Sequence, residues 1–345
     1  MTADTDSGSS SGASTAKIAG VIALYWVISI SMVFVNKNLL GDSHMPIDLS
    51  IFIAWVQCGA TVLIGLAVQL VQRRGSPADA APLFSGRLML RRQIVFLTCS
   101  YVGMLVFNNL CLKSVGVPFY QIARSMTLAF TVLFAMLILR QAVSAKVMLC
   151  CGLVVAGFLL GVDQEKLAGT LSVRGVVFGL TTSVFIALSG IFTKQALAVV
   201  DKDSVRLTLY NNANAFVLLA PVAIGSGQAY SVISLGLLVS RTFVSLLVVS
   251  SLLGFLIGWI SAVQINVTSP VTHHISANAK AVMQTLIAVV YYSDMKPPLW
   301  WLSVFMVVGG ALSYALVRLR ETAPTKADAG PDVEKGANGR LLSNS

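Results

Sequence analysis

Charged residues are scarce in this chain, at 11% of its 345 residues, whereas about 25% of the residues of a soluble domain are charged. Hydrophobic residues make up 56%. This composition excludes an ordinary soluble protein and indicates a membrane protein, with the lipid bilayer as its surroundings. The formal charge of +10 therefore needs no nucleic-acid partner, and we assign it to the orientation of the chain in the membrane.

Groups that bind metals or carry out catalysis are also few. The five cysteines lack zinc-type spacing, and we interpret them as small hydrophobic residues. His273 and His274 are adjacent, so on a helix their side chains point about 100° apart. Neither a third ligand nor a carboxylate lies near them in the sequence. We therefore expect no metal, no cofactor and no enzymatic activity.

We do not expect a cleavable signal peptide in the N-terminal segment. Residues 1–16 are rich in Ser, Gly and Thr and have neither a basic region nor a cleavage site. We predict disordered cytoplasmic tails at 1–17 and 321–345 and a single membrane domain at 18–320.

Apolar runs long enough to cross a bilayer, which takes about 20 helical residues, recur along the domain. Because they are continuously apolar, they indicate helices and not barrel strands. We predict ten spans, at residues 18–40, 49–72, 94–113, 117–139, 145–162, 171–197, 206–225, 241–262, 269–292 and 298–317. Lys and Arg concentrate in the loops after the even-numbered spans, which predicts cytoplasmic termini.

The segment "VDQEKLAGT" (162–170) divides the spans five and five, into halves at about 18–162 and 171–317. An odd number of spans in each half requires that the second half be inserted upside down, as in many transporters. Weak internal similarity supports this: "VNKNLL" (35–40) matches "FTKQAL" (192–197), and "GVPFYQIARSMT" (116–127) matches "TSPVTHHISANAK" (268–280). The predicted fold is an all-α membrane protein with ten transmembrane helices arranged as two inverted five-helix repeats.

The seventh span contains a polar cluster. Tyr210, Asn211 and Asn214 lie within about a 100° arc of one helix face, with Asn212 turned further round. Amides present paired donors and acceptors that suit the edge of a purine, and a tyrosine ring can border the base. The alternative is that these side chains hydrogen-bond neighbouring helices.

Two further spans contain deep cations. His273, Lys280 and Gln284 share a stripe of the ninth span, and Tyr120 and Arg124 share a stripe of the fourth. A charge at the centre of a span costs about 2.5–3.5 kcal/mol even on the lenient insertion scale.

No Asp or Glu lies at comparable depth in any predicted span. We infer that the missing counter-ion is the substrate and that two cations suit a pyrophosphate; the alternative is snorkelling to the interface. Weaker candidates for a cavity mouth are Lys37 and Lys194, near span ends, whereas packing is favoured for Asn108 and Asn109.

Several stretches resemble the GDP-fucose branch of the nucleotide-sugar transporters, in the drug/metabolite transporter superfamily. They include "FNNLCLKSVGVPFYQIARSMT" (107–127), "VRLTLYNNANA" (205–215), "TSPVTHHISANAKAVMQT" (268–285) and the tandem Trp300-Trp301. The similarity spans about residues 18–320. In related GDP-sugar transporters, a Phe-Tyr-Asn-Asn motif contacts guanine, and a Gly-Ala-Leu-Asn-Lys or Gly-Thr-Ala-Lys motif contacts the phosphate and sugar. The resemblance therefore implies substrate contacts at Tyr210, Asn211, Asn212 and at Asn278 and Lys280.

The resemblance also implies an activity: import of GDP-fucose into the Golgi lumen in exchange for GMP, by alternating access. Because Ala277 and Asn278 depart from the family motif, another GDP-sugar such as GDP-mannose or GDP-arabinose is an alternative. A carrier of UDP-sugars or phosphorylated metabolites is a more distant one. The resemblance allows a homodimer, whose interface the sequence does not indicate.

Overall fold

A computed structural model describes residues 7–40, 49–75, 86–138, 140–200, 203–267, 270–293 and 296–322. All regular structure in these residues is helical. The helices are α1 (Ser7–Leu40), α2 (Ser50–Gly75), α3 (Gly86–Met89), α4 (Arg92–Ser114), α5 (Val117–Ser125), α6 (Thr127–Leu137), α7 (Ala145–Leu167), α8 (Val173–Leu197), η2 (Ala198–Val200), α9 (Ser204–Gly225), α10 (Gln228–Ser234), α11 (Arg241–Val267), α12 (Pro270–Tyr291) and α13 (Pro298–Thr322).

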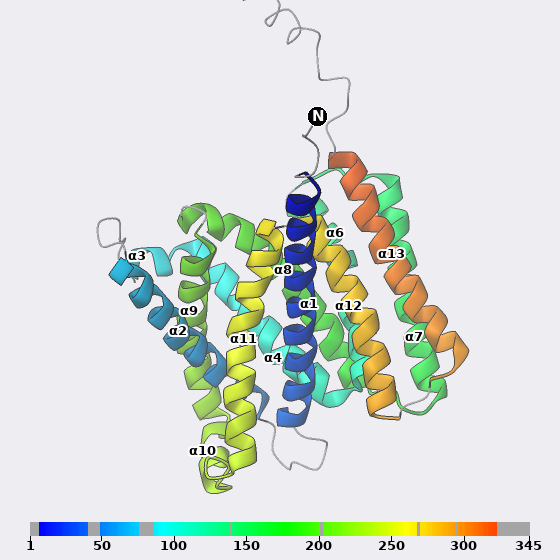
Figure 1. Cartoon of the computed structure of the whole chain (residues 1–345). Helices are drawn as coiled ribbons and strands as arrows, with labels where there is room; N and C mark the ends of the chain where they lie inside the picture. The colour runs from blue at the N-terminus through cyan, green and yellow to red at the C-terminus, as the bar shows by residue number, and fades with distance from the viewer. Residues whose placement is uncertain are drawn as a thin grey trace, which may run out of the picture.

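Nine of the described helical segments are long and apolar enough to cross a membrane, which confirms an all-α membrane protein. The predicted ninth span is the exception. It corresponds to α12, in which Ala279–Tyr291 forms a shorter apolar stretch among the residues whose side chains the structure describes. The start of α1 and the end of α13 lie at the same end of the molecule, uppermost in Figure 1.

Side-chain caps explain where several helices begin. The Ser144 hydroxyl accepts from the Val147 N–H at the start of α7, and the Asp203 carboxylate accepts from the Val205 and Arg206 N–H groups at the start of α9. The end of α7 differs from the prediction, because the helix continues from 162 to Leu167. The connection to α8 is therefore shorter than the predicted linker, and it turns at Gly169, whose φ is +71°.

The fourth span is broken in the middle. α5 ends at Ser125 and α6 begins at Thr127, and the Met126 N–H between them bonds to the Ala123 carbonyl at 3.4 Å, three residues back in place of four. Hydroxyls add to this bonding: Ser183 Oγ of α8 donates to Ala123 O at 3.0 Å, and Thr127 Oγ1 donates to Arg124 O at 2.7 Å. In a membrane, such side-chain bonds help to make a helix break tolerable.

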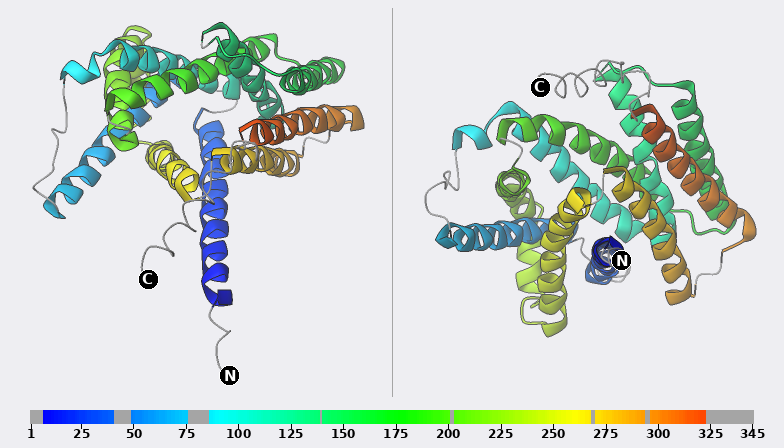
Figure 2. Two further views of the ribbon diagram at one scale, coloured as in Figure 1. Left: turned by 90° about the horizontal axis from the view of Figure 1, so that it is seen from above. Right: turned by 45° about the horizontal axis from the view of Figure 1, so that its top comes forward.

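The helices pack in pairs. α7 and α13 lie together at one edge of the molecule and α2 and α9 at the other, with α4 against α8 and α1 against α11 between them (Figures 1 and 2). Small residues allow the closest contacts. A Cβ added at Gly310 of α13 would lie 2.9 Å from the Cys150 carbonyl of α7, so only glycine permits this approach.

The largest apolar cluster lies at the lower end of Figure 1, where helices of both predicted halves meet. Its members from the first half include Leu39, Phe52 and Leu112, and those from the second include Phe243 and Trp300. The clusters that reach the upper end are smaller and more local. The lower end is therefore the more tightly closed.

Candidate substrate site

Lys280 lies in α12, where its side chain is held against α1. The residue is only 7% exposed. Its ammonium donates to Ser29 Oγ at 2.5 Å and lies 5.5 Å from the centre of the Tyr25 ring. One turn away, the Trp26 indole N–H donates to Ser276 Oγ at 2.9 Å, which fixes α1 against α12. A hydroxyl and a ring face thus surround Lys280.

Arg124 lies in the last turn of α5, beside the break in the fourth span. Its guanidinium donates to the Tyr120 hydroxyl at 3.3 Å, and that hydroxyl donates to Asn108 Oδ1 at 2.7 Å. The Arg124 side chain remains exposed although it lies in the middle of a span. α5 packs against α12, and Arg124 is within electrostatic range of Lys280 and Tyr25. The packing of these two helices therefore places the two predicted deep cations near each other.

Neither cation has an acidic partner among the described residues. The carboxylates described are those of Asp163, Glu165, Asp203 and Glu321, and all lie at or next to helix ends. Two neighbouring cations without a counter-ion repel each other, and the repulsion is strong in a low-dielectric setting. This arrangement is suited to a bound dianion.

Gln284 adds an unpartnered amide one turn beyond Lys280. Its side chain is fully buried, and neither its oxygen nor its nitrogen has a hydrogen-bond partner in the described part of the chain. Leaving one buried polar group unpaired costs about 1–3 kcal/mol. Gln284 is therefore available to a polar ligand or to water.

The polar cluster of α9 is engaged differently. Tyr210 is buried, and its hydroxyl accepts from Arg206 Nε at 3.0 Å. The Asn212 amide donates to the Thr208 carbonyl at 2.9 Å, and the Asn214 amide donates to the Met89 carbonyl at 2.9 Å. In this conformation these bonds of Tyr210 and Asn212 lie within α9, whereas the bond of Asn214 reaches the neighbouring helix α3, as the packing alternative expects for that residue.

Asn211 is the exception on α9. It is 6% exposed, and its side-chain oxygen is buried without a partner among the described residues. Among the described residues, no side chain of α9 forms a hydrogen bond with Lys280 or Arg124. The predicted purine site and the predicted phosphate site are thus not joined in one pocket here.

Several predicted residues are placed only in part. His273 and Asn278 belong to α12, but their side chains lie outside the described residues. Asn109 donates to the Ser50 carbonyl at 3.2 Å, consistent with packing, whereas Asn108 belongs to the Arg124 group.

Sequence reasoning missed the α1 side of the site. Tyr25, Trp26 and Ser29 hold Lys280 and Ser276, yet each residue type is common in membrane helices and none is charged. Their spacing of one turn, from Tyr25 to Ser29, was the available signal.

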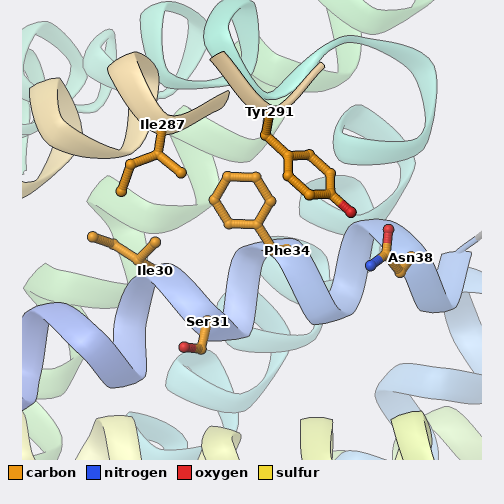
Figure 3. A pocket seen from close by; sticks show the side chains of 6 residues that line it. All are labelled: Ile30, Ser31, Phe34, Asn38, Ile287 and Tyr291. Carbon is orange, nitrogen blue, oxygen red and sulfur yellow. The ribbon is translucent and has the colours of Figure 1, made fainter. Parts of the chain in front are cut away.

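A separate cavity of about 250 Å³ lies between α1 and α12 (Figure 3). Phe34 of α1 contacts Tyr291 of α12 edge to face, with ring centres 5.8 Å apart. The cavity wall is mostly apolar and contains none of the predicted site residues.

A helical membrane protein with an uncompensated cation pair beside a broken span has the construction of a transporter for an anionic solute. The chain belongs to the Triose-phosphate Transporter family, whose model matches residues 16–315. It is 42% identical to "GDP-fucose transporter 1" of Nematostella vectensis, over 90% of this chain and 91% of that protein. It is also 42% identical to "GDP-fucose transporter 1" of Mus musculus, over 93% of this chain and 89% of that protein. With "GDP-fucose transporter, Golgi" of Drosophila melanogaster it shares 38% identity, over 88% and 91%.

Proposed function

We propose that this transporter moves GDP-fucose across the Golgi membrane in exchange for GMP. The observation that carries the proposal is the pair of neighbouring cations, Arg124 and Lys280, that has no acidic partner among the described residues. The names and organelle of its relatives supply the nucleotide sugar and the Golgi. GDP-fucose and GMP share a guanosine phosphate, so one site serves both.

The ligand contacts follow from the chemistry of the side chains. The diphosphate accepts charge-assisted hydrogen bonds from Lys280 and Arg124. Gln284 and the unpartnered oxygen of Asn211 then bind the sugar hydroxyls and the guanine edge. Tyr210, Asn212 and Asn214 join the base site in a conformation that releases their present bonds. His273 and Asn278 complete the predicted set.

We further propose ten spans in two inverted halves. Counting along the chain, α1 corresponds to α8, α2 to α9, α4 to α11, the α5–α6 span to α12, and α7 to α13. When each helix is replaced by its counterpart, the packed pair α4–α8 becomes the pair α11–α1, which is also packed. The pairs α2–α9 and α7–α13 each consist of two counterparts, so they are unchanged. This symmetry in the packing supports the inverted repeat.

Individual hydrogen bonds support it too. When "VNKNLL" is aligned with "FTKQAL", Trp26 and Ser183 occupy equivalent positions in the two halves. When Pro118 is aligned with Pro270, Arg124 and Ser276 are equivalent. Trp26 donates to Ser276, and its counterpart Ser183 contacts the Arg124 carbonyl at 3.5 Å. Equivalent positions are thus in contact in both arrangements, through two side chains in one and through a side chain and a backbone carbonyl in the other.

Alternating access proceeds by rocking of the two halves around the cation pair. With both termini cytoplasmic, as the distribution of Lys and Arg predicts, the lower end of Figure 1 is the lumenal end. The large apolar cluster there and the exposure of Arg124 support a conformation closed toward the lumen.

The test is uptake of labelled GDP-fucose into liposomes that contain the purified protein and are preloaded with GMP, UMP or no nucleotide. Uptake driven by internal GMP alone is expected. Uptake of GDP-mannose in its place would overturn the sugar assignment, and uptake driven by UMP would overturn guanine recognition. Asn211→Ala is expected to abolish uptake while the protein still reaches the Golgi.

A further inference from the structure

Lys37 donates hydrogen bonds to backbone carbonyls at the end of α4, at the lower end of the molecule in Figure 1. Its ammonium donates to the Leu112 carbonyl at 2.8 Å and to the Val115 carbonyl at 3.0 Å. These carbonyls terminate α4, where the last turn of a helix leaves acceptors without partners. A cation there is also favoured by the helix dipole. Lys37 thus joins the end of α1 to the end of α4, beside the large apolar cluster.

Lys194 is the counterpart of Lys37 in the second half, since "FTKQAL" aligns with "VNKNLL". It lies in the last turn of α8, at the opposite end of the molecule. Its side chain is exposed, and it makes no hydrogen bond or ion pair with any residue that the structure describes. Two equivalent lysines therefore have opposite environments.

The carbonyls that would receive Lys194 follow from the same correspondence. When Pro118 is aligned with Pro270, Leu112 is equivalent to Gln264 and Val115 is equivalent to Val267, both in the last turn of α11. α1 packs against α4, but the equivalent helices α8 and α11 are not in close contact over their described residues. One end has the lysine contact and the other lacks it.

We propose that Lys37 and Lys194 are paired gating residues, each capping a helix C-terminus when its own end of the transporter is closed. The proposal rests on the proposed alternating access. In the described conformation Lys37 holds the lumenal end closed. When the transporter opens to the lumen, Lys37 leaves the α4 carbonyls, and Lys194 binds the carbonyls of Gln264 and Val267.

Cys111 provides a reporter for the lumenal end. It lies in α4 within the large apolar cluster and is 1% exposed, so a soluble alkylating reagent reaches it only when that end opens. The experiment measures the alkylation rate of Cys111 in full-length protein whose other four cysteines are replaced by alanine. The variants are Lys37→Gln, Lys194→Gln, the double variant and Lys37→Arg. Lys166→Gln, an exposed lysine at the end of α7, is the charge-matched control.

The two lysines are expected to act in opposite directions. Lys37→Gln raises the alkylation rate about fivefold to tenfold, Lys194→Gln lowers it by a similar factor, and the double variant returns toward the parent rate. Lys37→Arg and Lys166→Gln stay near the parent. Unfolding cannot produce the decrease in Lys194→Gln.

An unchanged rate in Lys37→Gln, or a change in the same direction for both lysines, would overturn the pairing. The GMP exchange assay, run on the parent protein, separates this result from failure of the proposed function. If the parent protein exchanges GMP normally but the alkylation rate of Cys111 is the same in all variants, the gating proposal alone is rejected. Absent exchange in the parent rejects the transport cycle on which the gate rests.

Discussion

Two buried lysines of this protein differ in what balances their charge. Lys296, just before α13, lies 2.9 Å from a Glu165 carboxylate oxygen of α7, and both side chains are less than a tenth exposed. The same carboxylate accepts from the Trp300 indole at 3.0 Å and from the Thr170 hydroxyl at 2.5 Å. Lys280, which is equally buried, contacts a serine hydroxyl and a tyrosine ring and has no carboxylate partner among the described residues.

The comparison indicates the purpose of each cation. A buried ion pair is tolerated when further hydrogen bonds satisfy it, as they do around Glu165. There the protein supplies its own anion, and the group ties the ends of α7 and α13 together. Around Lys280 and Arg124 it supplies none among the described residues, which is consistent with the anionic substrate that we propose.

Removing the cations is expected to have the largest effect. Lys280→Ala and Arg124→Ala each lower GDP-fucose uptake about 1,000-fold, equivalent to about 4 kcal/mol, since truncating one partner of a desolvated charged pair costs about 2–5 kcal/mol or more. Uptake per amount of folded protein in liposomes measures this, with Lys166→Ala as control. Normal uptake by either variant would remove that residue from the site.

Breaking the internal pair has a different consequence. Glu165→Gln leaves Lys296 buried without its anion and is expected to cost about 3 kcal/mol of stability, while uptake per folded molecule is retained. Denaturation in detergent measures the loss, and adding Lys296→Met is expected to recover most of it. An unchanged unfolding midpoint for Glu165→Gln would show that this pair does not hold the two helices.

A substitution in α1 can supply Lys280 with an anion from the protein itself. Ser29→Asp places a carboxylate where Lys280 now finds a hydroxyl, and it is expected to lower uptake about 30-fold because the substrate must displace that carboxylate, at about 2 kcal/mol. The smaller loss expected for Ser29→Ala is the control. If Ser29→Asp transported as well as Ser29→Ala, charge compensation at Lys280 would be irrelevant.

The smallest effect is expected at Asn214. Its bond to the Met89 carbonyl is a neutral hydrogen bond between helices, so Asn214→Ala costs about 1 kcal/mol of stability. Thermal denaturation measures this, and Asn211→Ala, which breaks no such bond, provides the comparison. A loss of GMP binding by Asn214→Ala without a change in stability would place this residue in the site.

The helices and the two cations were predictable from the sequence, because long apolar runs and isolated charges within them are local signals. The partners of Lys280 were not. Ser29 is separated from it by 251 positions, and only packing brings α1 to α12. The break at Met126 was hidden because Val117–Leu137 is continuously apolar enough for one span. Glu165 fell in the predicted linker between two spans, whereas it lies in α7, where it contacts Lys296 and Trp300 from distant parts of the sequence.

We propose that Arg124 and Lys280 bind the phosphate groups of a guanine nucleotide. The most direct measurement is the rise in melting temperature of the purified protein with GMP, compared with guanosine, in the parent and in Arg124→Gln/Lys280→Gln. Saturating GMP is expected to stabilise the parent by about 2.7 kcal/mol at 100 times the Kd, guanosine much less, and the double variant not at all. An equal rise for GMP in the double variant and the parent would contradict the account.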